Sequence, residues 1–538
     1  MQHAADGDLH PEPRDLEKRP IVCAAPASVT LGVRSRGARS ATVNTDGPAN
    51  GDELFWLDAT ALARHYQRRT LSPVEVTRAT LARIDRLNPS LNAYCLVDHE
   101  AAMAAARESE QRWQAGKPLS RIDGVPTSIK DLILTRGWPT LRGSKTTDPT
   151  QSWNEDAPAT ARLREAGAVL LGKTTTPEFG WRASTESPLS GITCNPWDTT
   201  RTPGGSSGGA AASVAAGMGV LAVGTDGGGS IRIPAAFTGT VGIKPQFGRV
   251  PAWPASPMGT VAHLGPHARS VADAAAMLDV LARPDPRDGW ALAPTNHEHV
   301  LDAFADAGCA APPDLRGMRI AYSPRLGYVD CLDPEIERAL DAAAATLASL
   351  GATVERKDPG FPDCHDTFMV HWMTSARDML MKLPPAKRAL LDPGLRDAME
   401  DAARYTLADF LQAQSQRLEI AVAMRRLAQT HDLLLTPATA VLPFRTGQIA
   451  PHAGDDVPRE VAEAAGRFES FDWTWWTPYS TPFNLSQQPA IVLACGESTS
   501  GLPIALQLVA PHHQEALCIK AASAYQAATP WHLRRPPC

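Results

Sequence analysis

The chain has 538 residues, of which 43% are hydrophobic and 20% are charged, and its net charge is −6. This composition is ordinary for a globular protein, and the acidic balance argues against nucleic acid as a partner. The nine cysteines are spread singly along the chain, a pattern that gives neither a metal-binding signature nor a disulfide framework and favours a reducing compartment.

The first 51 residues differ from the rest. They are rich in Ala, Pro, Asp, Arg and Ser and lack sustained periodicity, so we expect residues 1–51 to be a disordered extension and residues 52–530 to form one domain. The apolar run Ile21–Ala25 is too short for the core of a signal peptide, and no segment has the length of a membrane-spanning helix. We therefore expect a cytoplasmic protein without a membrane partner.

The next segments alternate between helical and strand patterns. Two amphipathic helices are expected between Leu54 and Leu87. The second begins at Ser72, where an N-cap serine is followed by proline at N1 and Glu75 at N3. Further helices are expected at 97–113 and 158–166, and strands within 122–134 and at 168–171.

The most distinctive stretch runs from Arg201 to Pro245. Two glycine-rich turns carry serines there: one surrounds Ser206 and Ser207, and Gly227, Gly228 and Gly229 lead into Ser230. Glycine runs let successive N–H groups converge on an anion, and a serine at their end is a candidate nucleophile. Taken alone, the first turn has linker composition. Its neighbours, however, read as a short helix (210–217) and a buried strand (220–223).

A serine nucleophile needs a base, and this stretch contains no histidine. Lys130 lies upstream in an apolar, strand-like run that begins at Gly124. A lysine can act as a base when desolvation or a nearby positive charge keeps it neutral. A lysine next to Asp131 is more often part of a surface ion pair, so the residues alone leave both readings of Lys130 open.

Long motifs in a fixed order resemble the amidase signature family from about residue 54 to 526. They lie at 124–131, 172–180, 195–198, 203–209, 224–235, 239–245, 483–490 and 501–507. The resemblance implies an α/β fold with a large mixed central sheet that has helices on both faces. It also implies cleavage of carbon–nitrogen bonds in amides through an acyl-enzyme, with no metal and no cofactor.

Carried onto this sequence, the family's Ser-Ser-Lys triad falls on Lys130, Ser206 and Ser230. Ser230 is then the nucleophile, Ser206 the bridging serine held by a cis peptide bond, and Lys130 the base that acts through Ser206. The oxyanion hole and substrate contacts are expected at Gly227, Gly228, Gly229, Ser230, Gly180 and Trp181. Supporting roles fall on Ser207, Asp226 and Arg232. Trp181 is equally open to being a core residue.

The second half of the chain is expected to add strands and helices to the same sheet. Helices are predicted at 270–281, 333–350 and 512–527, and strands at 318–322, 352–357, 432–437, 491–494 and 503–509. Residues 366–427 match the family least, and we expect this helical region to cover the active site and set substrate choice. His365 and His371, six positions apart, do not share a helix face and are read as structural.

The expected substrate is a small to medium hydrophobic or aromatic amide or carbamate, and the resemblance suggests a homodimer. The aromatic cluster 471–476 is read as core, a pocket wall or an oligomer contact.

Three other functions compete. One is the amidase subunit of a tRNA-dependent amidotransferase. Another is a serine esterase of the α/β-hydrolase type, in which the Gly-x-Ser-x-Gly match at 204–208 makes Ser206 the nucleophile beside an essential histidine. The third, a catalytically dead binding protein, is disfavoured because all three triad residues are present.

Overall fold

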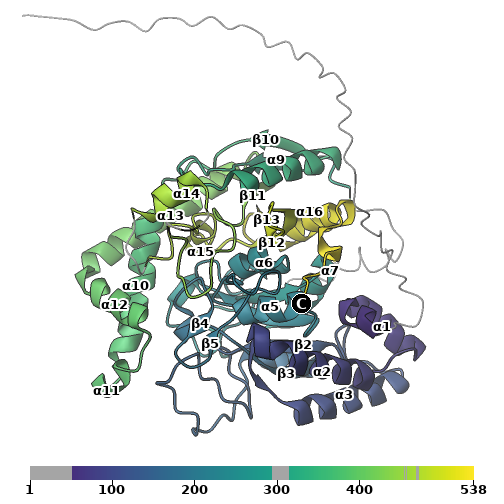
Figure 1. Cartoon of the computed structure of the whole chain (residues 1–538). Coiled ribbons are helices and arrows are strands. Elements are labelled where there is room, and N and C mark those ends of the chain that lie inside the picture. Colours follow the sequence, from purple (N-terminus) through teal and green to yellow (C-terminus); the bar gives the residue numbers. More distant parts are fainter. Residues whose placement is uncertain (1–50, 294–313, 453–454, 456, 468–471) are drawn as a thin grey trace, which may run out of the picture. The chain divides into compact units, whose positions relative to one another are not determined.

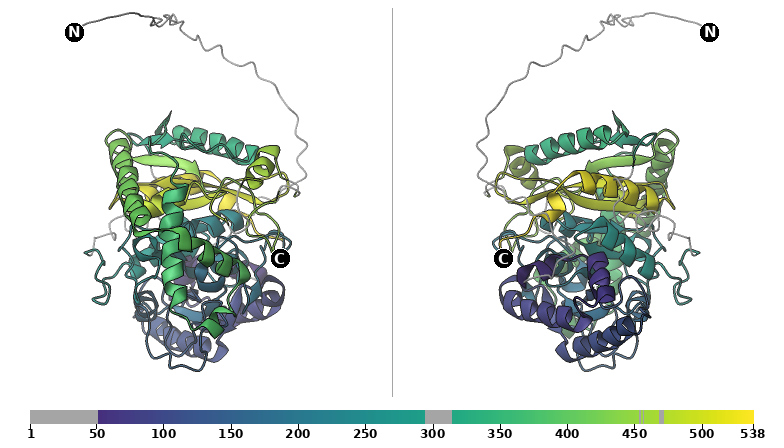
Figure 2. Two further views of the ribbon diagram at one scale, coloured as in Figure 1. Left: turned by 90° about the vertical axis from the view of Figure 1, so that its left-hand side faces the viewer. Right: turned by 90° about the vertical axis from the view of Figure 1, so that its right-hand side faces the viewer.

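The computed structural model describes residues 51–538 except 294–313, 453–454, 456 and 468–471 (Figures 1 and 2). The predicted disordered extension therefore lies outside the described residues, apart from Gly51, which begins the short helix η1 (Gly51–Trp56). Phe471 of the aromatic cluster lies outside them as well. Within the described part, no helix is both long enough and apolar enough to cross a membrane.

The described residues form a mixed sheet of 11 strands in the order β1-β3-β2-β6-β8-β7-β12-β13-β11-β9-β10, with a separate hairpin, β4 and β5. The predicted α/β class with a large mixed sheet is confirmed. The strands are β1 (Tyr94–Val97), β2 (Pro126–Lys130), β3 (Val169–Thr174), β4 (Glu186–Ser187), β5 (Gly191–Ile192), β6 (Leu221–Asp226), β7 (Val241–Lys244), β8 (His263–Ala268), β9 (Arg319–Tyr322), β10 (Thr353–Arg356), β11 (Leu433–Pro437), β12 (Ala490–Glu497) and β13 (Pro503–Val509).

The parallel strands β3, β2 and β6 position the catalytic candidates. In the register of β2 and β6, Thr127 lies opposite Leu221 and Ile129 lies opposite Val223. Parallel strands end at the same edge of a sheet. Lys130, the last residue of β2, is therefore beside Thr225 near the end of β6.

Helices cover both faces of the sheet, as expected. Along β3, Val169 and Leu171 pack with the helices α2 and α3, whereas Leu170 belongs to the larger core that includes Leu163 of α4. The helices are α1 (Ala59–Arg68), α2 (Pro73–Leu91), α3 (His99–Gln114), α4 (Pro158–Glu165), α5 (Gly208–Ala215), α6 (Arg232–Thr238), α7 (Val271–Leu281), α9 (Pro334–Ser349), α10 (His365–Met381), α11 (Pro385–Arg388), α12 (Pro393–Asp401), α13 (Leu407–Leu427), α14 (Arg459–Ala465), α15 (Thr481–Leu485) and α16 (Glu515–Ala528).

The start of α2 shows how local sequence sets an element. The Ser72 side chain accepts a hydrogen bond from the Glu75 amide, and the Glu75 carboxylate accepts one from the Ser72 amide. This reciprocal capping satisfies two amide groups that a helix start leaves unpaired. The predicted start at Ser72 is therefore confirmed, whereas the helix continues past the predicted end to Leu91.

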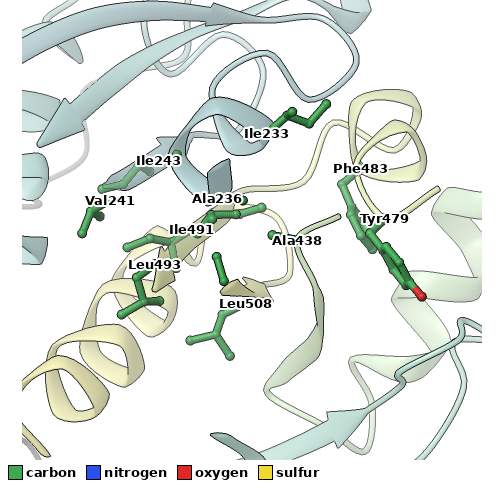
Figure 3. Packing of buried hydrophobic residues seen from close by; sticks show 14 of the residues in the cluster. Ile233, Ala236, Val241, Ile243, Ala438, Tyr479, Phe483, Ile491, Leu493 and Leu508 are labelled. Atoms are coloured by element: carbon green, nitrogen blue, oxygen red, sulfur yellow. The ribbon is translucent and has the colours of Figure 1, made fainter. Parts of the chain in front are cut away.

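The core beneath the catalytic loops is densely apolar (Figure 3). Ile233 of α6, Ile243 of β7 and Ile491 of β12 are each at most 1% exposed. Burying one such side chain contributes about 1.5–3 kcal/mol. Because α6 follows Ser230 almost directly, this packing fixes the loop that carries the candidate nucleophile.

The region predicted to be variable and helical forms α10 to α13, which lie on the opposite side of the body from α1–α3 in Figure 1. Beyond residue 530, where we expected the domain to end, the chain contacts the helix η1 at the beginning of the described residues. The Arg535 guanidinium donates to both carboxylate oxygens of Glu53, at 2.9 and 2.8 Å.

Candidate active site

Lys130 lies at the centre of a group of hydroxyls. Its Nζ is 2.7 Å from the Oγ of Ser206, 2.9 Å from the Oγ of Ser207 and 2.8 Å from the Oγ1 of Thr225. The Lys130 side chain is fully buried. The alternative that Lys130 forms a surface ion pair with Asp131 is wrong, because Asp131 pairs with Lys173 instead, at 3.2 Å.

Burial lowers the pKa of Lys130 well below its ordinary value, and the charge of Asp226 opposes this shift only in part. A neutral amine has two N–H donors and one lone pair. The Ser207 hydroxyl donates to the Thr225 carbonyl at 3.1 Å, so it can only accept from Lys130. The hydroxyl that donates to the neutral Nζ is therefore that of Ser206 or Thr225.

The same three contacts also suit a protonated lysine, whose three N–H groups would meet three hydroxyl oxygens. Lys130 can therefore gain or lose a proton while all its partners stay in place, and only a hydroxyl hydrogen has to turn. This is the behaviour that a general base requires.

The two serine loops contact each other directly. The Ser207 amide donates to the Ser230 carbonyl at 3.2 Å. The peptide bond between Gly205 and Ser206 is cis, as the family resemblance predicts. Gly205 packs so tightly that a Cβ there would lie 2.6 Å from the Ser184 carbonyl oxygen.

The loop between β6 and α6 is organised by the Asp226 carboxylate. It accepts hydrogen bonds from the amides of Gly229, at 2.8 Å, and Ile231, at 3.1 Å. We expected the Gly229 amide in the oxyanion hole, but in this structure that N–H donates to the Asp226 carboxylate. Among the described residues, the amides of Gly227 and Ser230 have no such acceptor.

Within the part of the chain that the structure describes, the Gly228 amide likewise donates to no acceptor, and the Gly228 carbonyl accepts a hydrogen bond from the Ser480 hydroxyl at 2.7 Å. Gly227 and Gly228 both lie against aromatic rings. A Cβ at Gly227 would lie 2.7 Å from the Trp372 ring, and a Cβ at Gly228 would lie 2.6 Å from the Phe368 ring. The loop thus has no room for larger residues.

Asp226 and Arg232 brace this loop, as expected. The Arg232 Nε lies 3.0 Å from the Asp226 carboxylate, and both side chains are fully buried. Arg232 also donates to Asn484 at 2.6 Å and to Gln507 at 2.9 Å. Burial raises the pKa of Asp226, but the Arg232 charge and hydrogen bonds outweigh it and hold that pKa far below its usual range.

Ser206 and Ser230 open onto a cavity of about 450 Å³. Its walls are mostly apolar and come from the segment after β2, from the loop 252–258 and from α10. Trp372 and Met379 show that α10 does cover this site. The lining residues are Leu132, Ile133, Leu134, Arg142, Ala157, Phe179, Gly180, Ser206, Thr225, Gly227, Ser230, Ala252, Trp253, Pro254, Ala255, Ser256, Pro257, Met258, Ala262, His263, Leu264, Trp372 and Met379.

Gly180 and Trp181 differ in their placement. Gly180 lines the cavity, and a Cβ there would lie 3.2 Å from the Ser206 Oγ. Trp181 is 2% exposed and is not among the residues that line the cavity, so it is a core residue, as one of the two interpretations predicted. Its carbonyl accepts from the indole N–H of Trp372 at 3.1 Å, so Trp181 supports the wall that Trp372 forms.

The other aromatic candidates are also core. Trp473, Trp475 and Trp476 are at most 9% exposed, and none lines the cavity. Sequence analysis missed Trp253, which does line it and stacks on Arg287, with the guanidinium carbon 4.8 Å from the ring centroid. The local signal was the turn-rich segment Trp-Pro-Ala-Ser-Pro at 253–257.

His365 and His371, which we interpreted as structural, both contact other side chains of the fold. His365 lies 2.9 Å from Asp472, and His371 is buried against the edge of the Phe410 ring. Beneath the site, burial and the nearby Lys130 lower the pKa of His267 to about 3. The α/β-hydrolase alternative requires a strand directly before Ser206, and the described chain has none at that point.

Comparison with known proteins decides the family. The family model described as Amidase matches residues 75–519. The chain belongs to the amidase family. It is 35% identical over 489 residues to an acylamidase of Rhodococcus erythropolis, covering 90% of this chain and 98% of that protein. It is also 35% identical over 510 residues to a glutamyl-tRNA(Gln) amidotransferase subunit of Chloroflexus aggregans, covering 90% and 99%.

Solved structures agree. A bacterial aryl acylamidase of the amidase signature family matches with a TM-score of 0.79 and 28% identity, covering 89% of this chain and 97% of that one. The 6-aminohexanoate cyclic dimer hydrolase matches with a TM-score of 0.77 and 31% identity, covering 90% and 99%. This amidase is therefore an amide-hydrolysing enzyme, and the α/β-hydrolase alternative is discarded.

Proposed function

We propose that this amidase hydrolyses small to medium hydrophobic or aromatic amides or carbamates, with Ser230 as nucleophile, Ser206 as relay and Lys130 as base. The observation that carries the proposal is the fully buried Lys130, whose lowered pKa favours the neutral amine 2.7 Å from the Ser206 hydroxyl. We further propose that the enzyme is cytoplasmic, needs no cofactor and forms a homodimer. Analytical ultracentrifugation tests the proposed homodimer.

In the proposed reaction, the Ser230 Oγ attacks the substrate carbonyl carbon. Its proton passes to Ser206, whose own proton passes to Lys130. The oxyanion accepts hydrogen bonds from the amides of Gly227, Gly228 and Ser230. Losing one such donor typically costs about 3–4 kcal/mol of transition-state stabilisation.

Collapse of this intermediate breaks the carbon–nitrogen bond, and the amine leaves with the proton returned from Lys130 through Ser206. Water then attacks the acyl-enzyme, gives up a proton along the same path and releases the carboxylic acid with free Ser230. In support of this path, Ser206 lies against the Lys130 amine, and Ser206, Gly227 and Ser230 line the cavity.

The competing function is the ammonia-releasing subunit of an amidotransferase, and the identity to such a subunit equals that to the acylamidase. The cavity favours the hydrolase. Glutamine carries an α-ammonium group that calls for a carboxylate partner. The described residues that line the cavity include no Asp or Glu, and most are apolar.

A fluorophosphonate probe tests the nucleophile. Intact-mass spectrometry should show one adduct on the wild-type chain, none on Ser230→Ala and slow labelling of Lys130→Ala. Ser349→Ala removes an exposed hydroxyl at the end of α9 and should label like wild type. Labelling of Ser230→Ala together with loss of labelling in Ser206→Ala would overturn the assignment.

Turnover tests the substrate class. Acetanilide, hexanamide and a phenyl carbamate should be hydrolysed faster than glutamine by the isolated chain. A preference for glutamine would instead support the amidotransferase function.

A further inference from the structure

Arg142 carries a guanidinium and is one of the residues that line the mostly apolar cavity. Its hydrogen bond within the described part of the chain is a long one, from Nη1 to the Thr140 carbonyl at 3.5 Å. A guanidinium has five N–H donors. Asp131, whose charge influences Arg142, is paired with Lys173. Arg142 therefore has N–H donors available for a ligand, and it lines the same cavity as Ser206 and Ser230.

The other basic group of the cavity wall is His263. Burial, together with the charge of Lys244, lowers the pKa of His263 well below its ordinary value. His263 is therefore neutral at physiological pH. Burial also lowers the pKa of Arg142, with the Asp131 charge acting against it, but a guanidinium starts so high that it stays charged. Arg142 thus supplies the positive charge of this wall.

The backbone at Arg142 has a left-handed conformation, which is unfavourable for a residue other than glycine. Arg142 has φ +59° and Phe179, which also lines the cavity, has φ +52°. Such left-handed conformations cost non-glycine residues about 1–2 kcal/mol each. The two residues are joined by a 2.8 Å hydrogen bond from the Phe179 amide to the Arg142 carbonyl. Strain of this kind is retained where side chains must be aimed.

We propose that Arg142 binds a substrate carboxylate, so that the preferred substrates are amides with an apolar body and one carboxylate away from the scissile bond. N-acylated aromatic amino acids and half-amides of dicarboxylic acids belong to this class. A guanidinium can grip a carboxylate with two parallel hydrogen bonds, and a poorly solvated cavity strengthens that pair. The inference rests on the proposed function and deepens it.

Two matched substrate pairs test the inference. Glutaranilic acid against valeranilide places the carboxylate on the acyl part, and 3-acetamidobenzoate against acetanilide places it on the amine part. In the wild type, kcat/KM should favour the acid at least tenfold in one pair. Arg142→Met should reduce that preference at least tenfold, mainly through KM. Arg142→Lys should reduce it less, because lysine keeps the positive charge, but should not match the wild type, because a lysine cannot bind with two parallel bonds.

Arg142→Asn is a second removal variant, since asparagine tolerates a left-handed backbone. Arg78→Met, an exposed change on α2, is the control and should keep the wild-type preference. Equal kcat/KM for acid and neutral partners in both pairs, or an unchanged preference in both Arg142 removal variants, would overturn the inference. Fluorophosphonate labelling of Ser230 separates this failure from failure of the proposed function, because labelling does not depend on a substrate carboxylate.

Discussion

The Nζ of Lys130 lies 2.7 Å from the Oγ of Ser206, although a lysine normally carries a charge and both side chains are almost completely buried. Burial makes the neutral lysine the working form. Protonation at low pH removes the lone pair that must accept the Ser206 proton. We therefore expect kcat/KM for a non-ionising anilide to fall as pH decreases through the lowered pKa of Lys130, and to be level above it.

The measurement is a pH–rate profile, with the enzyme's fold monitored by circular dichroism at each pH. A rate that keeps rising to about pH 10.4, the ordinary lysine value, would show that Lys130 is not the base. Lys130→Ala should lose roughly 10³-fold or more in kcat/KM across the whole range, because general base catalysis and the position of Ser206 are lost together.

Ser207 holds Lys130, the proposed base, and is not expected to react itself. Its Oγ accepts from Lys130 at 2.9 Å and from the Thr225 amide at 3.2 Å, and it donates to the Thr225 carbonyl. Ser207→Ala should lower kcat by roughly tenfold with little change in KM, since one hydrogen bond is worth about 1 kcal/mol. Fluorophosphonate should label the Ser207→Ala variant more slowly than the wild type, but the final product should still carry one adduct. Complete loss of labelling would assign Ser207 a direct part in proton transfer.

Asp226 anchors the loop that carries Ser230, the proposed nucleophile. Asp226→Ala leaves the Arg232 charge buried without its carboxylate, and breaking a buried pair in this way costs about 3–5 kcal/mol. We expect a lower midpoint in urea unfolding as well as lost activity. Asp378→Ala, which removes an exposed partner of Lys382, is the control and should change the midpoint little. A wild-type midpoint for Asp226→Ala would contradict the anchoring role.

Gly228 is held against the Phe368 ring, so Gly228→Ala should push the loop away from its position and lower kcat/KM at least tenfold. Phe368→Leu should relieve the clash, and the double variant should recover part of the lost activity. Such non-additivity is the mark of residues in contact. Gly289→Ala, where a Cβ meets nothing within 4 Å, is the control. Simple additivity of the two changes would show that the loop does not shift.

The sequence predicts that Lys130, Ser206 and Ser230 lie together because each belongs to a local motif. Lys130 ends a recognisable strand, and Ser206 and Ser230 lie in glycine-rich turns beside patterned segments. Strand β8 could not be predicted, since its Gly265 and Pro266 break the strand pattern. In the structure, both Gly265 and Pro266 fit within the sheet. A Cβ at Gly265 would lie 2.1 Å from the Ile243 carbonyl oxygen, and β7 pairs only with the residues after Pro266.

The cavity wall was beyond local sequence reasoning. Trp181 lies next to Gly180 and was a reasonable wall candidate, yet Trp372, 191 positions later in the chain, takes that place and donates to the Trp181 carbonyl. Arg142 and Trp253 lie in loops and line the cavity. The conformation of a loop cannot be predicted from hydrophobic periodicity, so the position of these two residues could not be predicted from the sequence. The use of the Gly229 amide by Asp226 likewise depends on how the loop turns.

His365 gives stability a pH dependence. Burial acts to lower its pKa, but the hydrogen bond to Asp472 and the charges of Asp472 and Asp366 outweigh it and raise the pKa to about 9. Since the unfolded value is about 6.5, this contribution to the unfolding free energy is complete below pH 6.5 and is lost as pH rises through 9.

Urea unfolding of wild type and His365→Gln should therefore differ by about 1–3 kcal/mol at pH 6, and the difference should vanish by about pH 10. His99→Gln is the matched control, because His99 faces Asp85 at 3.2 Å with both side chains at least half exposed. Water screens such a pair, so this variant should show little difference at either pH. A His365→Gln difference that stays constant from pH 6 to 10 would mean that packing, and not the charged His365–Asp472 pair, stabilises this corner of α10.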